Sequence, residues 1–501
     1  MNNFLSSLKN ETNYGYTENG AITHKHTNSA ILDMFAVGGA YRNRSDDDCI
    51  WLFKRALDEN ETLALKCLFY LRDCRGGQGE RRFFRVCFSW LADARSDLAR
   101  RNLINISEYG RWDDLIYSCL DTSLEKNAFS IIRKQLMLDM QCKTPSLLAK
   151  WMPSENASSY KTKAAAAKLR NYLGLSHKEY RLMLSELRAR INVLERLMSA
   201  NEWDKIEFDK IPSKAGLIYK NAFARRDIIA KKYETFVKSN STKVNANVLN
   251  PVDIAHEAFY ANRKDNVDRA ALQKYWDNLK DYYNGREENG IAIIDTSGSM
   301  WGQPLEAAVS MGAYIAERGH GPFANHFITF SAYPDLIEFK GVDIVDKFQR
   351  AGQANWGGNT NIEAVFDLML QTALKNHTSP EDMPQTLYIF SDMEFDGCIT
   401  SGESYEEAWG RYRYKLLRGE NAINTLFENI SKKWDSYGYK LPRVIFWNLD
   451  CRNGINIPAF GKRFSYVSGF NMNMVETILS GKDGYDLMIE KLMSERYTII
   501  K

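Results

Sequence analysis

The stretch Ile291-Ala292-Ile293-Ile294-Asp295-Thr296-Ser297-Gly298-Ser299 joins a short apolar run to a carboxylate and two serine hydroxyls. A short apolar run followed by turn residues is typical of a buried strand. In open α/β sheets, ligands bind beyond the carboxyl ends of the strands, which is where these polar side chains are expected. Oxygen donors of this kind suit hard divalent cations such as Mg²⁺. The stretch therefore predicts an α/β domain with a cation site at one edge of its sheet.

Two later segments add oxygen donors in a fixed order along the chain. Gly357-Gly358-Asn359-Thr360-Asn361-Ile362 offers a threonine hydroxyl before an amphipathic helix, and Leu387-Tyr388-Ile389-Phe390-Ser391-Asp392 ends an apolar run on a carboxylate. The simpler interpretation is that these residues are only helix caps and turns. Their order, however, resembles the metal-ion-dependent adhesion site of von Willebrand factor A (vWA) domains. The predicted metal ligands are Asp295, Ser297, Ser299, Thr360 and Asp392, with Mg²⁺, Mn²⁺ or Ca²⁺ as the ion.

The resemblance also implies how these side chains share the ion. Ser297 and Ser299 would ligate it directly, and Thr360 would do so in one of two states. Asp295 and Asp392 would act partly through bound water. One coordination position would stay open for a carboxylate from an acidic protein partner, and a nucleic-acid phosphate is a physically equivalent ligand.

Composition limits the class of protein and its compartment. A chain of 501 residues has room for two or more domains. Its 8 cysteines lack C-x-x-C spacing, which argues against a disulfide framework or a zinc site. The chain has no apolar run near the roughly 20 residues of a membrane span and no secretory signal at its start. We therefore expect a cytoplasmic protein without a membrane partner.

Charge is distributed unevenly along the chain. Residues 290–501 hold 20 Lys and Arg against 26 Asp and Glu, a balance of −6, whereas residues 1–289 hold 46 against 37, a balance of +9. Residues 143–235 alone hold 19 basic and 10 acidic residues, which equals that excess. Such segregation favours a polyanion-binding face on the first half of the chain. A helical surface that is merely rich in Lys and Arg explains the charge equally well.

Hydrophobic periodicity divides the chain into a polar N-terminal segment (1–30), a helical domain (31–284) and an α/β domain (285–501). Apolar residues three and four apart predict helices such as 61–72, 81–94 and 221–237. Helix pairs in series favour an α-helical repeat domain, either a solenoid or a ring. After Gly290 the rhythm becomes βαβ, with strands expected at 291–295, 326–330, 335–339, 386–392, 443–448 and 464–468. This alternation predicts a doubly wound, Rossmann-like domain with a mostly parallel sheet and helices on both faces, and the resemblance of its metal-site motif implies the vWA type.

Four blocks in the helical half broaden the resemblance. They are Leu71-Arg72-Asp73-Cys74-Arg75-Gly76-Gly77-Gln78-Gly79-Glu80-Arg81-Arg82, Tyr109-Gly110-Arg111-Trp112-Asp113-Asp114-Leu115, residues 146–154 and residues 203–213. They resemble the signature blocks of a family of unknown function that joins a helical region to a C-terminal vWA-like domain. The layout distantly resembles the Ro autoantigen, in which a TROVE module of helical repeats accompanies a vWA domain. That resemblance implies binding of non-coding or structured RNA by a basic helical surface.

Basic and aromatic residues of the helical half are the candidates for RNA contact. The arginines and glycines of residues 71–82 suit a phosphate, or else form a flexible turn paired to Asp73 and Glu80. Tyr160, Tyr172 and Tyr180 are interleaved with the basic residues, and we expect them to stack on unpaired bases. The residues expected to contact RNA are Arg75, Arg81, Arg82, Lys150, Lys161, Lys163, Lys168, Arg170, Arg181, Arg188, Arg225, Arg226, Lys231 and Lys232.

The chain carries no recognisable catalytic motif. It lacks G-x-S-x-G, H-E-x-x-H and Walker sequences, and its 7 histidines are scattered. We therefore expect a binding protein and not an enzyme. The main expectation is an RNA-binding protein with a Mg²⁺-dependent vWA domain. The alternative is a vWA scaffold without RNA binding, which recruits an acidic partner such as an ATPase chaperone complex.

Overall fold

The chain folds into two compact units that interleave along the sequence. The structure is a computed structural model, and it describes residues 13–501 except 192–193, 240, 243, 245, 247–248, 263, 284, 331–333, 354–360, 397–425 and 460. The first unit, called the α/β unit, comprises Met1–Arg44, Asn250–Tyr260 and Asp281–Lys491. The second, called the helical unit, comprises Ser45–Leu249, Ala261–Lys280 and Leu492–Lys501.

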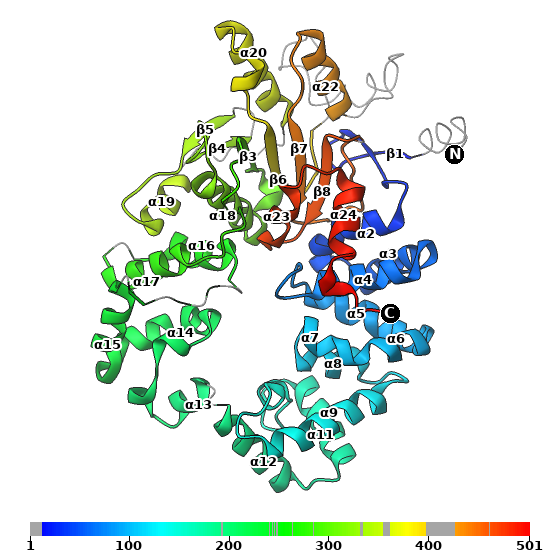
Figure 1. Ribbon diagram of the computed structural model, residues 1–501, viewed down its shortest axis with the longest axis vertical. Helices are drawn as coiled ribbons and strands as arrows, with labels where there is room; N and C mark the ends of the chain where they lie inside the picture. The colour runs from blue at the N-terminus through cyan, green and yellow to red at the C-terminus, as the bar shows by residue number, and fades with distance from the viewer. Residues whose placement is uncertain are drawn as a thin grey trace. The chain divides into compact units, whose positions relative to one another are not determined.

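A six-stranded sheet forms the centre of the α/β unit. Its strands are β3 (Gly290–Asp295), β4 (His326–Phe330), β5 (Asp335–Glu338), β6 (Thr386–Ser391), β7 (Arg443–Asn448) and β8 (Phe464–Ser468). They lie in the order β5-β4-β3-β6-β7-β8, with β5 and β8 at the two edges (Figure 1). All neighbouring strands are parallel except β4 and β5. The mixed α/β prediction and the mostly parallel sheet are confirmed.

Helices cover both faces of this sheet. Helix α18 (Gln303–Arg318) packs on the face that carries Ala292 and Ile294, since a Cβ on Gly312 would come within 2.5 Å of Ile294 Cδ1. The opposite face carries Phe446, whose ring lies 4.7 Å from that of Phe427 in α22 (Leu426–Ser436). Further helices of this unit are α19 (Ile344–Ala351), α20 (Glu363–Asn376), α23 (Val475–Ile478) and α24 (Gly484–Leu492).

The strand order creates a switch point between β3 and β6. From β3 the chain continues to β4 on one side, whereas β6 leads to β7 and β8 on the other. At such a point the connections leave the sheet in opposite directions, so the carboxyl ends of the two strands border a crevice that commonly receives ligands. The ends of β3 and β6 carry Asp295 and Ser391, with Asp392 directly after.

Residues 13–44 are built into the α/β unit, although the sequence placed residues 1–30 outside both domains. Strands β1 (Tyr14–Tyr16) and β2 (Ile22–His24) form a hairpin, and α2 (Ala30–Val37) packs against β8. The amide of Gly39 donates to Ser468 Oγ at 3.0 Å. Helix α16 (Pro251–Tyr260) joins the same unit by packing on α18.

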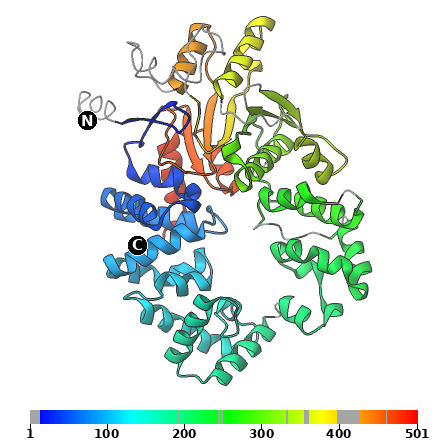
Figure 2. The same cartoon turned by 180° about the vertical axis from the view of Figure 1, so that it is seen from behind.

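The helical unit is a succession of helices in which chain neighbours pack on each other. Figure 2 shows this succession as a colour change from blue through cyan to green. The helices are α3 (Asp46–Glu59), α4 (Glu61–Arg72), α5 (Arg81–Ala94), α6 (Ser96–Asn102), α7 (Ile106–Tyr109), α8 (Trp112–Cys119), α9 (Glu125–Gln141), α10 (Leu148–Trp151), α11 (Tyr160–Leu173), α12 (His177–Arg190), α13 (Leu194–Ser199), α14 (Ser213–Arg225), α15 (Asp227–Lys238) and α17 (Asn266–Asp277).

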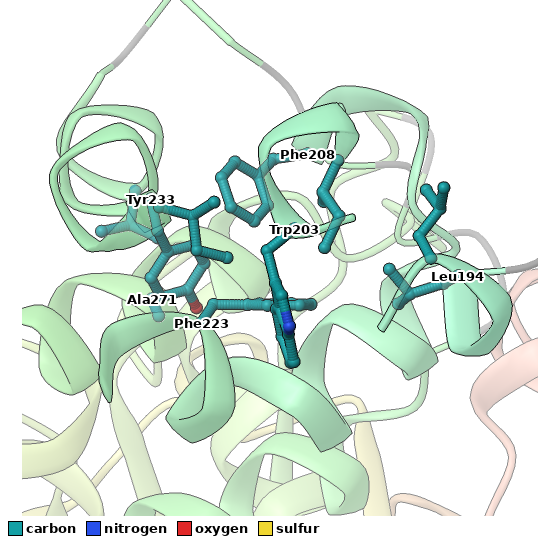
Figure 3. Packing of buried hydrophobic residues seen from close by; sticks show 10 residues of the cluster. Leu194, Trp203, Phe208, Phe223, Tyr233 and Ala271 are labelled. Carbon is teal, nitrogen blue, oxygen red and sulfur yellow. The ribbon is translucent and has the colours of Figure 1, made fainter. Parts of the chain in front are cut away.

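The prediction of a single helix over residues 221–237 is wrong, because the helix is interrupted at Arg226. Arg226 has extended backbone angles (φ −95°, ψ 108°) and separates α14 from α15. Phe223 on α14 and Tyr233 on α15 then meet in one apolar cluster with Trp203 and Phe208 (Figure 3). Folding the two helices back on each other buries both apolar faces, and this gain outweighs the local helix preference.

No helix of the described residues is both long enough and apolar enough to cross a membrane.

Candidate functional site

Asp295 lies at the carboxyl end of β3 and is fully buried. Its Oδ1 accepts from the amide of Ser297 at 2.9 Å, and its Oδ2 accepts from Ser391 Oγ at 2.5 Å. Ser391 ends β6, so this bond joins the two strands that border the switch point. Sequence reasoning did not single out Ser391, although its position directly before Asp392 at a strand end was a usable signal.

The two predicted serine ligands converge on each other. Ser297 Oγ and Ser299 Oγ lie 2.9 Å apart. Two neighbouring oxygens on an octahedral Mg²⁺ with bonds of about 2.1 Å are separated by about 3.0 Å. The hydroxyl pair is therefore spaced as two adjacent ligands of one such ion would be, and the donor set of this site fits Mg²⁺.

Asp392 provides the second buried carboxylate, with 1% of its surface exposed. Its Oδ1 accepts from the amide of Glu394 at 3.2 Å, and its Oδ2 accepts from Arg452 Nη2 at 2.7 Å. Arg452 follows β7 and stands 60 positions beyond Asp392 in the chain. Nothing in the local sequence around Arg452 indicated that it would reach this edge of the sheet.

The electrostatics of the site favour a cation. Burial and, after it, the nearby charge of Asp392 raise the pKa of Asp295 to about 7, against hydrogen bonds from Ser391 and Ser297 that lower it. Two neighbouring carboxylates in a dry site are costly when both are ionised. A divalent ion held between them would offset both desolvation and repulsion, because it is the largest local charge in such a site.

Glu394, close to the carboxyl end of β6, connects the N-terminal segment to this edge of the sheet by hydrogen bonds. Its carboxylate is 1% exposed and accepts from the amide of Glu18 at 2.6 Å and from Asn456 Nδ2 at 2.9 Å. The hydroxyl of Thr17 donates to the carbonyl of Phe395 at 2.6 Å. Both oxygens of Glu394 are thus engaged in holding protein segments together.

The structure brings together four of the five predicted metal ligands: Asp295, Ser297, Ser299 and Asp392. The fifth, Thr360, lies outside the described residues. Within the described ranges, no group of three or more His, Cys, Asp and Glu side chains is arranged to hold a metal ion. The donors at this edge are instead two carboxylates and two hydroxyls.

The predicted RNA-contact residues fall into two groups in the structure. Those in the first group are exposed and make no ion pair within the described part of the chain: Arg81, Lys161, Lys163, Arg181, Arg225, Arg226 and Lys231. Lys232 is also exposed, but its Nζ donates to the carbonyl of Ile206 at 2.7 Å, so it belongs with the second group. Those in the second group are engaged by the fold: Arg75 with the carbonyl of Glu108, Arg82 with Asp46, Lys168 with Asp121 and Glu125, Arg170 with Glu155, and Arg188 with the carbonyls of Ala149 and Met152. Lys150 is half-buried beside Trp151.

Of the expected stacking tyrosines, Tyr180 is buried in the fold and Tyr172 is half-buried. Tyr180 is 1% exposed, and its hydroxyl donates to the carbonyl of Pro153 at 2.8 Å, so the expectation that it stacks on bases is wrong. Tyr172 packs edge-on against Phe129 with ring centroids 5.5 Å apart. Tyr160 is 85% exposed and is the one of the three whose ring is open to solvent.

The glycine-rich loop of residues 73–80 folds back on α4. The amides of Gln78 and Glu80 donate to the carbonyls of Tyr70 and Leu71, at 3.1 and 2.7 Å. A Cβ on Gly77 would lie 1.9 Å from the carbonyl oxygen of Tyr70, so glycine is required for this close approach. The carboxylate of Asp73 pairs with Arg496, which lies outside the loop. These glycines allow the chain to reverse direction. The amides of Gln78 and Glu80 donate to α4, so they do not point to a phosphate site.

Comparison with known proteins assigns the chain to a family. Residues 17–117 and 139–282 match the model "Domain of unknown function (DUF2828)", and residues 289–497 match "Domain of unknown function (DUF7788)". Uncharacterized protein L728 of Acanthamoeba polyphaga mimivirus is 30% identical over 514 residues, which cover 94% of this chain and 85% of L728. The chain therefore belongs to the same family as L728, with a helical DUF2828 region followed by an α/β DUF7788 domain.

Proposed function

We propose that this protein binds RNA through its helical unit and a Mg²⁺-dependent ligand through a vWA-type site in its α/β unit. The observation that carries the metal half is the meeting of Asp295, Ser297, Ser299 and Asp392 at the switch point of the sheet. The RNA half is supported by the exposed basic residues of α11, α12, α14 and α15.

In this proposal Ser297 and Ser299 ligate the ion directly, and Asp295 supplies the charge that holds it. Both oxygens of Asp392 already accept hydrogen bonds, which suits a role through bound water. Two carboxylates face one Mg²⁺ and the guanidinium of Arg452, so the site keeps a net positive charge that attracts an external oxygen ligand. Phosphoryl-transfer sites usually gather more carboxylates around their ions, so we propose ligand binding and not catalysis.

Metal binding is tested by thermal unfolding of the full chain with and without Mg²⁺ or Mn²⁺. A ligand that binds the folded state raises the free energy of unfolding by mass action, by about 2.7 kcal/mol at a hundredfold excess over Kd, and the midpoint temperature rises with it. The shift should appear in the wild-type protein and disappear in Asp295→Asn and Ser297→Ala. Ser310→Ala in α18 is the matched control, because Ser310 is a buried serine bonded only to its own helix at Ala307. Equal shifts in the control and in both site variants contradict the assignment.

RNA binding is tested by fluorescence anisotropy with a labelled single-stranded RNA at several salt concentrations. Neutralising phosphates releases counterions, so log Kd should change linearly with log salt, with a slope of about 0.7 per contacted phosphate. The protein should bind at low salt with little dependence on RNA sequence. Failure of folded wild-type protein to bind at low salt removes RNA from the proposed function.

The second candidate is a protein scaffold whose metal binds a carboxylate of an acidic partner. Trp301, two positions after Ser299, is 77% exposed. Tryptophan is enriched at the centres of protein interfaces, and an exposed one beside a cation site suits an acidic partner. Metal-dependent binding of an acidic peptide, abolished by Trp301→Ala while the Mg²⁺-induced thermal shift remains, favours this candidate.

A further inference from the structure

Two aromatic rings of the helical unit are each flanked by two cations. The Arg111 guanidinium carbon lies 4.1 Å from the ring centre of Trp151, and Lys150 Nζ lies 5.6 Å from it. The Arg85 guanidinium carbon lies 4.9 Å from the ring centre of Tyr117. Lys161 Nζ lies 6.0 Å from the same ring. Contacts at this range hold cations in place without neutralising them.

These residues come from helices that pack on one another. Arg85 lies on α5 and Tyr117 on α8, which pack side by side (Figure 1), and Lys150 and Trp151 belong to α10, which also contacts α8. The hydroxyl of Tyr117 lies 3.4 Å from Thr162 Oγ1, so the first turn of α11 reaches the same place. A surface gathered from four helices is fixed by packing and does not depend on a mobile loop.

The carboxylates of Asp113 and Asp114 near these rings are already paired with arginines. Asp114 accepts from Arg72 and Arg85, and Asp113 pairs with Arg85 and Arg111. Within the described part of the chain, Arg81, Lys150 and Lys161 make no ion pair. Positive charge therefore exceeds negative charge at this surface.

The excess of positive charge also affects the pKa of Arg81. Partial desolvation, together with the charges of Arg111 and Arg85, holds the pKa of this exposed guanidinium below its usual value. An arginine crowded by other arginines is an unfavourable arrangement on its own. An external anion bound among them relieves the repulsion.

We propose that Arg81, Arg111, Lys150 and Lys161, with the rings of Trp151 and Tyr160, form a binding site for single-stranded RNA. This surface, here called the cation–aromatic site, rests on the proposed RNA-binding function and gives it a location. Two of its members, Arg111 and Trp151, were not among the residues expected from the sequence to contact RNA.

The chemistry of the site matches a nucleic-acid strand better than an acidic protein. Cations interleaved with aromatic rings suit a polymer that alternates phosphates with flat bases. Tyr160, 85% exposed beside Lys161, is available for a base to stack on. Arg111 is pre-organised for a phosphate, because stacking on Trp151 restricts its side chain.

The test compares two double variants of the full-length protein, measured by anisotropy with a labelled oligouridylate. Arg81→Gln with Lys161→Gln removes two exposed cations of the site. Arg133→Gln with Lys134→Gln removes an exposed arginine and an exposed lysine from α9 and is the matched control, because neither residue belongs to the site or to the residues expected to contact RNA. At about 100 mM salt the site variant should bind about tenfold more weakly. Its salt slope should fall by roughly 1.4, which corresponds to two phosphates, whereas the control should stay within about twofold of wild type.

Tyr160→Ala separates base stacking from charge attraction. It should weaken oligouridylate binding roughly fivefold or more, because stacking contributes about 1–3 kcal/mol per base. It should leave the affinity for inorganic polyphosphate, which has no bases, unchanged. Tyr160 is exposed, so its loss costs the fold little packing.

The outcomes separate the site from the wider proposal. Equal losses in the site variant and the control indicate diffuse charge attraction and overturn the site while RNA binding stands. If Tyr160→Ala weakens the binding of RNA and of polyphosphate equally, the proposed site is also overturned. It is likewise overturned if the protein binds polyglutamate more tightly than oligouridylate, because that result indicates a protein partner. No binding by the folded wild-type protein overturns the proposed function itself.

Discussion

At the residue scale, Asp114 illustrates a buried charge that the fold must satisfy completely. It is fully buried, accepts from Arg72 and Arg85, and also accepts from the amide of Arg111 at 2.9 Å. Burial alone would raise its pKa, but the two guanidinium groups hold that pKa below the ordinary 3.8. Asp114→Asn should therefore lower the free energy of unfolding at neutral pH by about 3–5 kcal/mol, since it leaves arginines unpaired.

The pH dependence of this effect follows from linkage. A carboxyl with a lowered folded-state pKa contributes its full stability above the unfolded-state value and loses it as pH falls toward the folded-state value. The difference between wild type and Asp114→Asn should stay constant from pH 7 to about 5 and shrink below 3.8. Urea unfolding at each pH measures it, with Asp97→Asn, an exposed partner of Arg100, as the control. A difference that grows in acid contradicts the ion-pair account.

At the element scale, the reversal after α4 depends on one glycine. Because the Cβ of Gly77→Ala would meet the backbone oxygen of Tyr70 at 1.9 Å, no side-chain rotation relieves the clash. The loop itself must shift, at the expense of the hydrogen bonds from Gln78 and Glu80 to α4. We expect a loss of about 3 kcal/mol, the upper end for overpacked sites.

Gly298→Ala is the matched control for this experiment. A Cβ there meets nothing within 4 Å, and its backbone angles suit any residue. Thermal unfolding should show a clear drop in the midpoint for Gly77→Ala and almost none for Gly298→Ala. Similar midpoints for the two variants would show that the loop adjusts without cost.

At the scale of the whole molecule, each unit is completed by a segment from the far end of the chain. Ile31, Met34, Phe35 and Val37 on α2 are at most 1% exposed within the α/β unit. Four such side chains contribute roughly 6–12 kcal/mol, which rivals the entire stability of a typical domain. A protein that begins at Ser45 should therefore fail to fold its α/β unit, seen as rapid proteolysis within residues 281–491.

The opposite truncation should affect the other unit. Arg496 Nη2 donates to Asp73 at 2.7 Å, and the hydroxyl of Tyr497 donates to the same carboxylate at 3.0 Å. Both contacts lie within the helical unit, so deleting residues 492–501 should expose residues 45–249 to protease and spare the α/β unit. Intact cores in both truncated proteins would contradict the interleaved arrangement.

The sequence by itself determined the strands of the large sheet, many of the helices and the local half of the proposed metal site. Apolar runs bounded by turn residues indicated all six strands of the large sheet to within one residue at each end, because these signals act over a few neighbouring positions. Asp295, Ser297 and Ser299 were identifiable for the same reason, since one turn carries all three. The break at Arg226 was missed, because no glycine or proline marks it.

Only the tertiary structure decided which distant residues meet. Pairing of β3 with β6 brings Ser391 to Asp295, and the loop after β7 delivers Arg452 to Asp392. Burial of Tyr180 and stacking of Arg111 on Trp151 likewise depend on how helices pack. Local propensity and periodicity specify where an element begins and ends. Which side chains share a site depends on burial and pairing between segments that are far apart in the chain, and no local pattern encodes that choice.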